Sequence, residues 1–547
     1  MKNLLQIDKY FIAIFGIFGF LFWHFAKDML QIRSDGWYVG HVNLWGDLAY
    51  HLTLINKFLE SGNLLPDNPI FAGDKINYPI FADWSTAQIA RFTGVDFALF
   101  ITTFIVGLIL IYISRYFIKI FIKNDKIVFL VLLIFFLNGG LGFYYFFQDY
   151  LSSGNSIFNF LINLPREYTN IQQNGYWWIN VYLAYFLPQR GFLFAFPITL
   201  TVLILLYLGW QKSNKKFFIL AGFLAGILPL VQAHSLFVIF LISLFFSIVT
   251  VLFAKGKKGV ILNWAIFASL TIVLALPIFN VVSSIGNPLK YFRFDPGWTS
   301  QENIFWFWFK NLGLFAPMLL ISLIWLFKKN RQFLILYSPF LLIFLLSNIF
   351  IFQPWDFDNG KLLIYWFFAS SIVVAYFLYD QFFAEDFVRK TLGLIILFFM
   401  IFAGGLDIFR TFTPITNYQL FSRQDLEVAA AVKNLTPKNT QFVTANNHNH
   451  PIPVLTGRST LLGFPGWIWS HGIDYYQREI DIQDIYTGGK KAERLISQYK
   501  VNYITVGPNE RASFNINEGY FTKYPSIFLG SGWVIYDVSY LWTDGDR

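Results

Sequence analysis

Long apolar runs alternate with short polar connections through the first three quarters of the chain. A helix needs roughly 20 apolar residues to cross the hydrocarbon core of a membrane. By this measure the pattern predicts about eleven transmembrane helices, at Tyr10 to Phe25, Phe97 to Ser114, Ile127 to Phe147, Gly191 to Trp210, Phe217 to Gln232, Ser235 to Ala254, Val260 to Asn280, Ile304 to Phe327, Gln332 to Ile349, Leu362 to Leu378 and Thr391 to Phe409. The expected class is a polytopic α-helical membrane protein.

The first long polar connection, residues 34–96, has a helical pattern of its own. Apolar side chains recur at helical spacing from Leu48 to Leu59, and Gly62 supplies a stop signal. This pattern predicts an amphipathic helix with Asp47 at or near its N-terminus. A second helix is expected over 83–92.

Beyond the last apolar run, charged residues become frequent and short helix and strand patterns alternate. Residues 422–435 indicate a helix that begins near Asp425, 441–444 and 503–506 indicate strands, and 480–500 indicates further helix. We therefore expect two domains: a transmembrane domain, 1–410, with external loop 34–96, and an extracytoplasmic α/β domain, 411–547.

Composition supports the membrane assignment and gives an orientation. The chain is 56% hydrophobic, 21% aromatic and only 13% charged, far from the composition of soluble domains. The net charge of +9 comes mainly from Lys and Arg clustered between apolar runs, which is the pattern of cytoplasmic loops and not a nucleic-acid stripe. With Lys2 and Lys9 on that same side, the N-terminus is expected in the cytoplasm as a retained anchor, and the C-terminal domain outside. The absence of Cys excludes disulfides and thiolate chemistry.

Asp47 is the first candidate catalytic residue, with His51 one helical turn after it. A carboxylate at a helix start is often only an N-cap. The place of Asp47 beside a membrane span and the nearby His51 favour a chemical role instead.

Other external segments offer groups that could bind a substrate. Trp177 lies in a loop rich in Asn, Tyr and Trp, which suits either the interfacial aromatic belt or the apolar face of a sugar. Arg190, directly before a span, could snorkel to the membrane surface or bind a lipid phosphate. His234, in an apolar hairpin, is expensive to bury unless it faces a cavity or a partner, so either a site or a structural hydrogen bond is open. Arg293 adds a cation on the same side, where it could simply be solvated.

The segment from Gln353 to Lys361 concentrates polar groups between two spans. Asp356, Asp358 and Asn359 are ordinary turn formers, which explains part of the pattern. Lys361 is not a turn former, and it begins a span on the side poor in basic residues, so it could bind an anionic headgroup. Farther along, the alternating His448 and His450 are too weak a pattern to predict a zinc site.

These features together resemble the GT-C superfamily of integral-membrane glycosyltransferases, which includes protein mannosyltransferases, aminoarabinose transferases and oligosaccharyltransferases. The resemblance covers about residues 1–410 and rests on the many spans and on the acid, Asp47, after span one. The tail, with Gly463-Phe464-Pro465-Gly466-Trp467 and Tyr503-Ile504-Thr505-Val506, also resembles the tails of uncharacterised multispan proteins grouped near that superfamily. The chain has no Asp-Glu pair at the position typical of protein mannosyltransferases and no Trp-Trp-Asp motif.

The resemblance implies inverting transfer of a sugar from a polyprenyl-phosphate donor to a glycan, lipid or protein acceptor. Asp47 would be the general base, and Arg190, Lys361 and His234 would hold the departing phosphate. Asp356 and Asp358 would bind sugar hydroxyls or a divalent cation, Mg²⁺ or Mn²⁺, for which the sequence gives no complete ligand set. The alternatives are a transporter or flippase of a lipid-linked sugar or polymer, which usually shows an internal repeat that is absent here, and a scaffold for envelope assembly.

Overall fold

The computed structural model describes residues 9–282 and 291–543. Its contacts divide these residues into two compact units. The helical unit holds residues 9–26, 103–278 and 291–416, and the mixed unit holds residues 27–102, 279–282 and 417–543. Loop 34–96, expected as an appendage of the transmembrane domain, thus groups with the C-terminal region. Lys2 lies outside the described residues.

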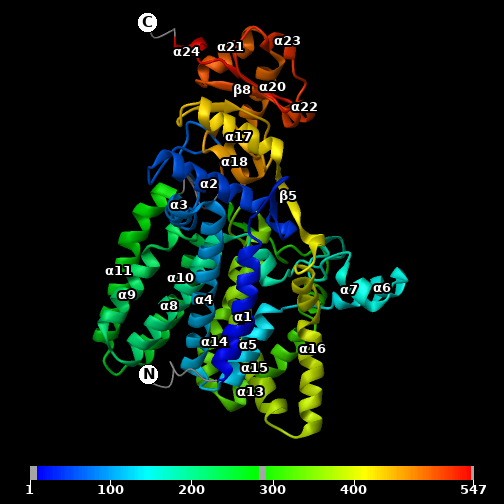
Figure 1. Cartoon of the computed structure of the whole chain (residues 1–547). Coiled ribbons are helices and arrows are strands. Elements are labelled where there is room, and N and C mark those ends of the chain that lie inside the picture. Colours follow the sequence, from blue (N-terminus) through cyan, green and yellow to red (C-terminus); the bar gives the residue numbers. More distant parts are fainter. Residues whose placement is uncertain (1–8, 283–290, 544–547) are drawn as a thin grey trace. The chain divides into compact units, whose positions relative to one another are not determined.

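The helical unit is a bundle of long apolar helices that run side by side (Figure 1). Its elements are α1 (Lys9–Lys27), α4 (Val95–Phe121), α5 (Asp125–Phe136), α6 (Phe143–Ser153), α7 (Ile157–Ile162), α8 (Arg190–Gln211), α9 (Lys215–Gly226), α10 (Ala233–Phe253), α11 (Lys257–Val282), β3 (Arg293–Phe294), α12 (Ile304–Leu312), α13 (Phe315–Lys329), α14 (Arg331–Ile349), β4 (Phe350–Ile351), α15 (Gly360–Leu378) and α16 (Phe387–Arg410). Of these, α4 begins in the mixed unit and α11 ends there. Helix α15 is the core of this bundle, because it packs against α5, α13 and α14 and is almost wholly buried.

Eight of the described helices are long and apolar enough to cross a membrane, or nine if the bent pair α12 and α13 forms one span. The chain is therefore a multi-pass membrane protein. The exact number of eleven spans stays a prediction. Two of the expected spans are interrupted: 127–147 is broken between α5 and α6, and 304–327 bends by 97° between α12 and α13. In a third, 217–232, the helix α9 ends at Gly226 and is too short to be counted among the eight.

Both interruptions meet at three glycines. A Cβ on Gly139 would lie 2.6 Å from the backbone nitrogen of Gly404, and one on Gly140 would lie 2.2 Å from the carbonyl oxygen of Lys310. Gly313, with φ of +58°, ends α12 against the backbone of Gly140. Backbones this close leave no space for side chains. The helical runs that begin with α5 and α12 are therefore interrupted where these segments meet.

The mixed unit joins the first loop to the C-terminal region. Its elements are β1 (Gln31–Arg33), β2 (Gly36–Val39), α2 (Asp47–Ser61), α3 (Phe81–Thr93), β5 (Tyr418–Ser422), α17 (Arg423–Leu435), β6 (Gln441–Val443), α18 (Pro451–Thr456), β7 (Ser459–Thr460), α19 (Pro465–Ser470), α20 (Tyr476–Thr487), α21 (Gly489–Gln498), β8 (Tyr503–Val506), α22 (Pro508–Ser513), α23 (Glu518–Phe521), β9 (Ser526–Gly530), β10 (Trp533–Asp537) and α24 (Tyr540–Thr543). The expected α/β character of the C-terminal region is confirmed.

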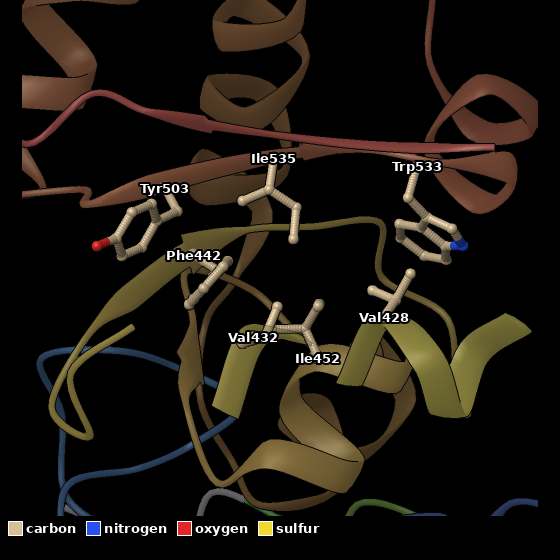
Figure 2. Close-up of a cluster of buried hydrophobic side chains, with 7 residues drawn as sticks. All are labelled: Val428, Val432, Phe442, Ile452, Tyr503, Trp533 and Ile535. Atoms are coloured by element: carbon tan, nitrogen blue, oxygen red, sulfur yellow. The ribbon is translucent and has the colours of Figure 1, made fainter. Parts of the chain in front are cut away.

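Two sheets organise this unit. The five-stranded sheet has the order β7-β6-β8-β10-β9, in which β6 runs parallel to β7 and β8 while β10 is antiparallel to β8 and β9. Figure 2 shows its core, where side chains of β6, β8 and β10 face those of α17 and α18: Val428, Val432, Phe442, Ile452, Tyr503, Trp533 and Ile535. The smaller sheet, β1-β2-β5, pairs Gly36 of the first loop with Ser422 of the C-terminal region. A Cβ on Gly36 would lie 2.2 Å from the carbonyl oxygen of Phe421, so this pairing requires glycine.

Further contacts bind α2 to the C-terminal region. Asn56 donates its side-chain amide to the carbonyl of Val454 at 2.9 Å, and Lys57 donates to the Ser459 hydroxyl at 3.0 Å. The helix that carries Asp47 is thus built into the α/β region by hydrogen bonds as well as by packing.

Candidate functional site

Asp47 is the first residue of α2, as the apolar pattern predicted, and it is half-buried. The N-cap position belongs to Gly46, which makes no side-chain capping bond. Asp47 is therefore not the N-cap residue itself, although it lies in the first turn, where the helix dipole favours a negative charge. Gly62 ends the helix in the left-handed conformation, φ +68°, as expected.

His51 lies one turn beyond Asp47 and faces a partner that the sequence analysis did not single out. Its Nδ1 is 2.9 Å from both carboxylate oxygens of Asp83, the third residue of α3. Both side chains are buried: His51 is 2% exposed and Asp83 is 0% exposed. A carboxylate without contact with water needs such a partner, so the pair couples α2 to α3 directly below the turn that carries Asp47. His51 stays a predicted catalytic residue, and its burial favours a role in positioning.

Aromatic side chains surround the same turn. Trp45 contacts His448 with ring centroids 4.1 Å apart, and a Cβ on Gly46 would lie 3.1 Å from the His448 ring. Tyr50 contacts Trp467 and His471 at 5.1 and 5.2 Å. These partners come from the C-terminal region, so residues before and after Asp47 in the sequence both contact it.

The two histidines of the 446–450 loop have separate partners. His448 stacks on Phe464 with centroids 3.4 Å apart, and burial lowers its pKa to about 4, so it is neutral at pH 7. His450 is buried and lies 2.7 Å from Glu510, which is also fully buried. Among residues 9–282 and 291–543, no group of three or more His, Asp or Glu side chains could hold a metal ion. The possible Mg²⁺ or Mn²⁺ stays a prediction.

The second group of candidates lies in the helical unit, around the connection from Gln353 to Lys361. Lys361, the second residue of α15, is 7% exposed and forms an ion pair of 2.9 Å with Asp358. Asn359 is fully buried and donates to the carbonyls of Ser347 and Phe350, while its own oxygen accepts from Gln353 at 2.7 Å. The segment is therefore held in one conformation by its side-chain contacts, unlike a plain mobile turn.

Gln353, which the sequence analysis did not select, brings two of the predicted binding residues to this segment. His234 Nε2 lies 3.3 Å from the Gln353 side-chain oxygen, so this histidine has a hydrogen-bond partner. Arg293 donates to the Gln353 carbonyl at 3.3 Å and lies 3.6 Å from Asp295, with its side chain exposed. The pairing of β3 with β4 carries Arg293 to this position.

The remaining candidates differ in how they contact the group. Asp356 accepts from the Phe357 backbone N–H at 2.8 Å, and the Trp177 ring lies 6.4 Å from the Phe357 ring. Arg190 begins α8 with 0% exposure and donates to the Thr103 hydroxyl at 3.0 Å. Its burial disagrees with a side chain that snorkels outward.

Tyr185 is a member of this group that the sequence did not indicate. Its ring stacks on Phe357 with an interplanar angle of 7°, and its hydroxyl lies so close to Gly360 that no side chain would fit there. The Tyr185 hydroxyl is buried with no hydrogen-bond partner in the described part of the chain. In the sequence, Tyr185 lies in a run of Tyr and Phe before a span, and nothing there distinguishes a site residue from an ordinary packing residue.

Comparison with solved structures decides the fold. The apo form of ArnT from Cupriavidus metallidurans matches 97% of this chain and 98% of its own, with a TM-score of 0.51 and 10% identity. The apo oligosaccharyltransferase of Archaeoglobus fulgidus matches 91% of this chain and 70% of its own, with a TM-score of 0.52 and 11% identity. The chain has the GT-C fold. The fold expected from the sequence resemblance is thus confirmed.

A third structure, ArnT from the same bacterium bound to undecaprenyl phosphate, matches 98% of this chain and 99% of its own, with a TM-score of 0.48 and 10% identity. No protein-family model matches the sequence, and no curated protein matches it significantly.

Proposed function

We propose that this protein is a membrane glycosyltransferase that moves a sugar from a polyprenyl-phosphate donor to an acceptor hydroxyl outside the cytoplasm. The observation that carries the proposal is a half-buried carboxylate, Asp47, in the first helical turn of the first loop of a GT-C fold. ArnT, whose apo form has this fold, binds undecaprenyl phosphate. This supports the donor class.

In the proposed reaction Asp47 accepts the proton of the acceptor hydroxyl. The acceptor oxygen forms a bond to the anomeric carbon of the sugar, while the bond from that carbon to the phosphate oxygen breaks. The electron pair of that bond leaves with the polyprenyl phosphate. A single displacement of this kind inverts the configuration of the anomeric carbon. The Asp83–His51 pair supports this role, because it fixes the turn of α2 from below.

The leaving phosphate needs fixed positive charge. The pair of Lys361 and Asp358, fixed by the buried Asn359, supports a headgroup site in the helical unit. The exposed Arg293 adds a second positive charge beside it, and His234, linked to the same Gln353, stays a proposed contact. Arg190 and Trp177 stay proposed contacts for phosphate and sugar.

The test uses the purified full chain in nanodiscs, radiolabelled polyprenyl-phosphate sugars and a mixture of envelope acceptors. Asp47→Asn should abolish transfer while donor binding persists. Asp67→Asn, an exposed acid of the same loop, should transfer like the wild type. Equal transfer by Asp47→Asn would refute the assignment of the base. If no donor is transferred, but liposomes show movement of a lipid-linked sugar between leaflets, the protein is a transporter.

The headgroup site is tested separately by donor affinity. Lys361→Met removes one charged hydrogen-bond donor, which is worth about 1.5–3 kcal/mol and thus about a 10- to 100-fold weaker Kd for the donor. Lys329→Met is the matched control, because Lys329 is half-exposed and pairs with Asp380 elsewhere in the same unit. An unchanged Kd for Lys361→Met would remove this lysine from the donor site.

A further inference from the structure

Six ring-bearing side chains, joined through Tyr50, form a cluster around the turn that carries Asp47, all within the mixed unit. We call this group the aromatic cluster; its members are Trp45, Tyr78, His448, Phe464, Trp467 and His471. His448 contacts Trp45 at 4.1 Å, Phe464 at 3.4 Å and Trp467 at 5.3 Å. Tyr78 contacts His471 at 5.1 Å. Tyr50, 5% exposed, lies beneath the cluster and contacts three of its members.

The cluster is only partly buried. Trp45 is 37% exposed, and the other five members are each half-buried. Aromatic rings of a structural core are normally covered on all sides, whereas these rings keep part of their surface open around the turn that carries Asp47. An open set of aromatic side chains of this kind is typical of a binding surface.

Backbone hydrogen bonds fix the C-terminal members in register with the first loop. The Thr460 N–H donates to the Pro69 carbonyl at 2.8 Å, the Ala72 N–H to the Thr460 carbonyl at 3.1 Å, and the Gly463 N–H to the Ile70 carbonyl at 2.7 Å. A Cβ on Gly463 would lie 2.8 Å from the Ile70 side chain. This ladder leads directly into α19, so Trp467 and His471 are placed beside Tyr50 by the backbone itself.

The chemistry of the cluster indicates its ligand. Five of its six members combine an aromatic face with a polar N–H, O–H or ring nitrogen. A lipid tail needs none of these polar groups. A sugar ring needs both features, because its C–H face packs on aromatic rings while its hydroxyls form hydrogen bonds.

We infer that the aromatic cluster is the acceptor site of the proposed transferase, and that the acceptor is a glycan whose pyranose ring stacks on Trp45 and Trp467. This inference rests on the proposed function, since it places the acceptor hydroxyl at Asp47. It gives the C-terminal region a direct part in acceptor recognition, beyond covering the reaction.

The experiment measures binding, so that it does not depend on turnover. The full chain is placed in nanodiscs, because glucoside and maltoside detergents would themselves occupy a sugar site. Methyl glycosides of glucose, galactose and mannose serve as probes, and saturation-transfer NMR reports which ring protons contact the protein. We expect transfer to the C–H face of at least one glycoside.

Substitutions locate the site. Trp467→Ala and Trp45→Ala should each weaken glycoside binding about three- to tenfold, the worth of one aromatic contact. Trp469→Ala is the matched control, since Trp469 lies on the same short helix with 43% exposure and outside the cluster. If Trp467→Ala fails to fold, Trp45→Ala decides, because Trp45 lies in an exposed turn.

The outcomes separate this inference from the proposed function. Binding of no glycoside, or equal binding by Trp467→Ala, Trp45→Ala and Trp469→Ala, would overturn the acceptor site even if transfer to another acceptor is observed. Transfer only to a peptide acceptor would overturn the glycan class. Glycoside binding that depends on Trp45 and Trp467 supports the sugar site even when no donor sugar is transferred, in which case the proposed function fails alone.

Discussion

Glu510 closes the loop that carries His448 to the Asp47 turn, and replacing it by glutamine tests this connection. One of its carboxylate oxygens accepts from the Ala445 N–H at 2.8 Å, from His450 at 2.7 Å and from the Thr505 hydroxyl at 3.1 Å. The other accepts from the Gly507 N–H at 2.8 Å. Both ends of the 445–450 loop are thus held by one fully buried carboxylate.

The electrostatics of this carboxylate set the size of the effect. Burial alone would raise its pKa, but His450 and the backbone donors lower the pKa of Glu510 below its ordinary value. In Glu510→Gln the amide has one oxygen for donors on both sides, so at least one buried donor loses its acceptor and the charge opposite His450 is lost. Breaking a buried pair costs about 3–5 kcal/mol. For a unit of this size, about 3 kcal/mol lowers the unfolding midpoint by about 6–12 °C.

The assay is thermal unfolding of the full chain in nanodiscs, followed by Trp fluorescence, to which Trp533 beside His450 contributes. Glu518→Gln is the control: its partner Arg511 is exposed, and a surface pair of this kind is worth about 1 kcal/mol or less. The pH dependence has a definite sign. Because the folded pKa of Glu510 is lowered, its stabilisation is present above the ordinary pKa of glutamate and is lost as the pH falls through the folded pKa. A midpoint for Glu510→Gln within 2 °C of the wild type, with roughly 1 kcal/mol as the largest cost it allows, would refute this reasoning.

Three further predictions concern the mixed unit. Burial lowers the pKa of His448 to about 4, so between about pH 6.5 and 4 the unfolded chain binds a proton that the folded chain does not. Stability should therefore fall as the pH is lowered through this range. His448→Phe should remove this component of the pH dependence in unfolding curves recorded across the same range. Asp83→Asn should lower the unfolding midpoint by the equivalent of about 1–3 kcal/mol, because His51 loses its buried carboxylate, and an unchanged midpoint would show that the pair contributes nothing. Gly36→Ala should separate β2 from β5, because the added Cβ would overlap the Phe421 carbonyl; faster proteolysis of that strand is the expected sign, and wild-type protection would contradict it.

The sequence predicts the local elements well because their signals are local. The spacing from Leu48 to Leu59 with Gly62 as a stop gives α2 almost to the residue, and Ser422 with Asp425 forms the capping box that begins α17. The strand patterns at 441–444 and 503–506 give β6 and β8.

The interruptions of the predicted spans depend on contacts between distant backbones. Hydropathy over 127–147 is continuous, and only the approach of Gly140 to Lys310 and Gly313 explains why α5 ends early and α12 bends. A sliding hydropathy pattern contains no information about a crossing 170 residues away.

The candidate site also has a part that the sequence predicts and a part that it does not. The place of Asp47 after the first span identifies it as a candidate, but the residues around it cannot be predicted from the sequence. Asp83 pairs with His51 across 32 positions, and Trp467 reaches Tyr50 only because of the backbone ladder at 460–463. Gln353 belongs to the polar segment that the sequence indicates, but only its contacts with His234 and Asn359 distinguish it within that segment.

The small sheet β1-β2-β5 has a consequence for the biosynthesis of the chain. Gln419 donates to the carbonyl of Asp35 across 384 residues, so the first loop lacks its partner strand until residues 418–422 of the 547 have been made. At about 5–20 residues per second, this delay is roughly 20 to 75 seconds. During that time α2 and its carboxylate stand without the strand and the aromatic residues that later surround them. If translation stops before β5, the first loop therefore stays without its partner strand. The surroundings of Asp47 are complete only after the C-terminal region has been synthesised.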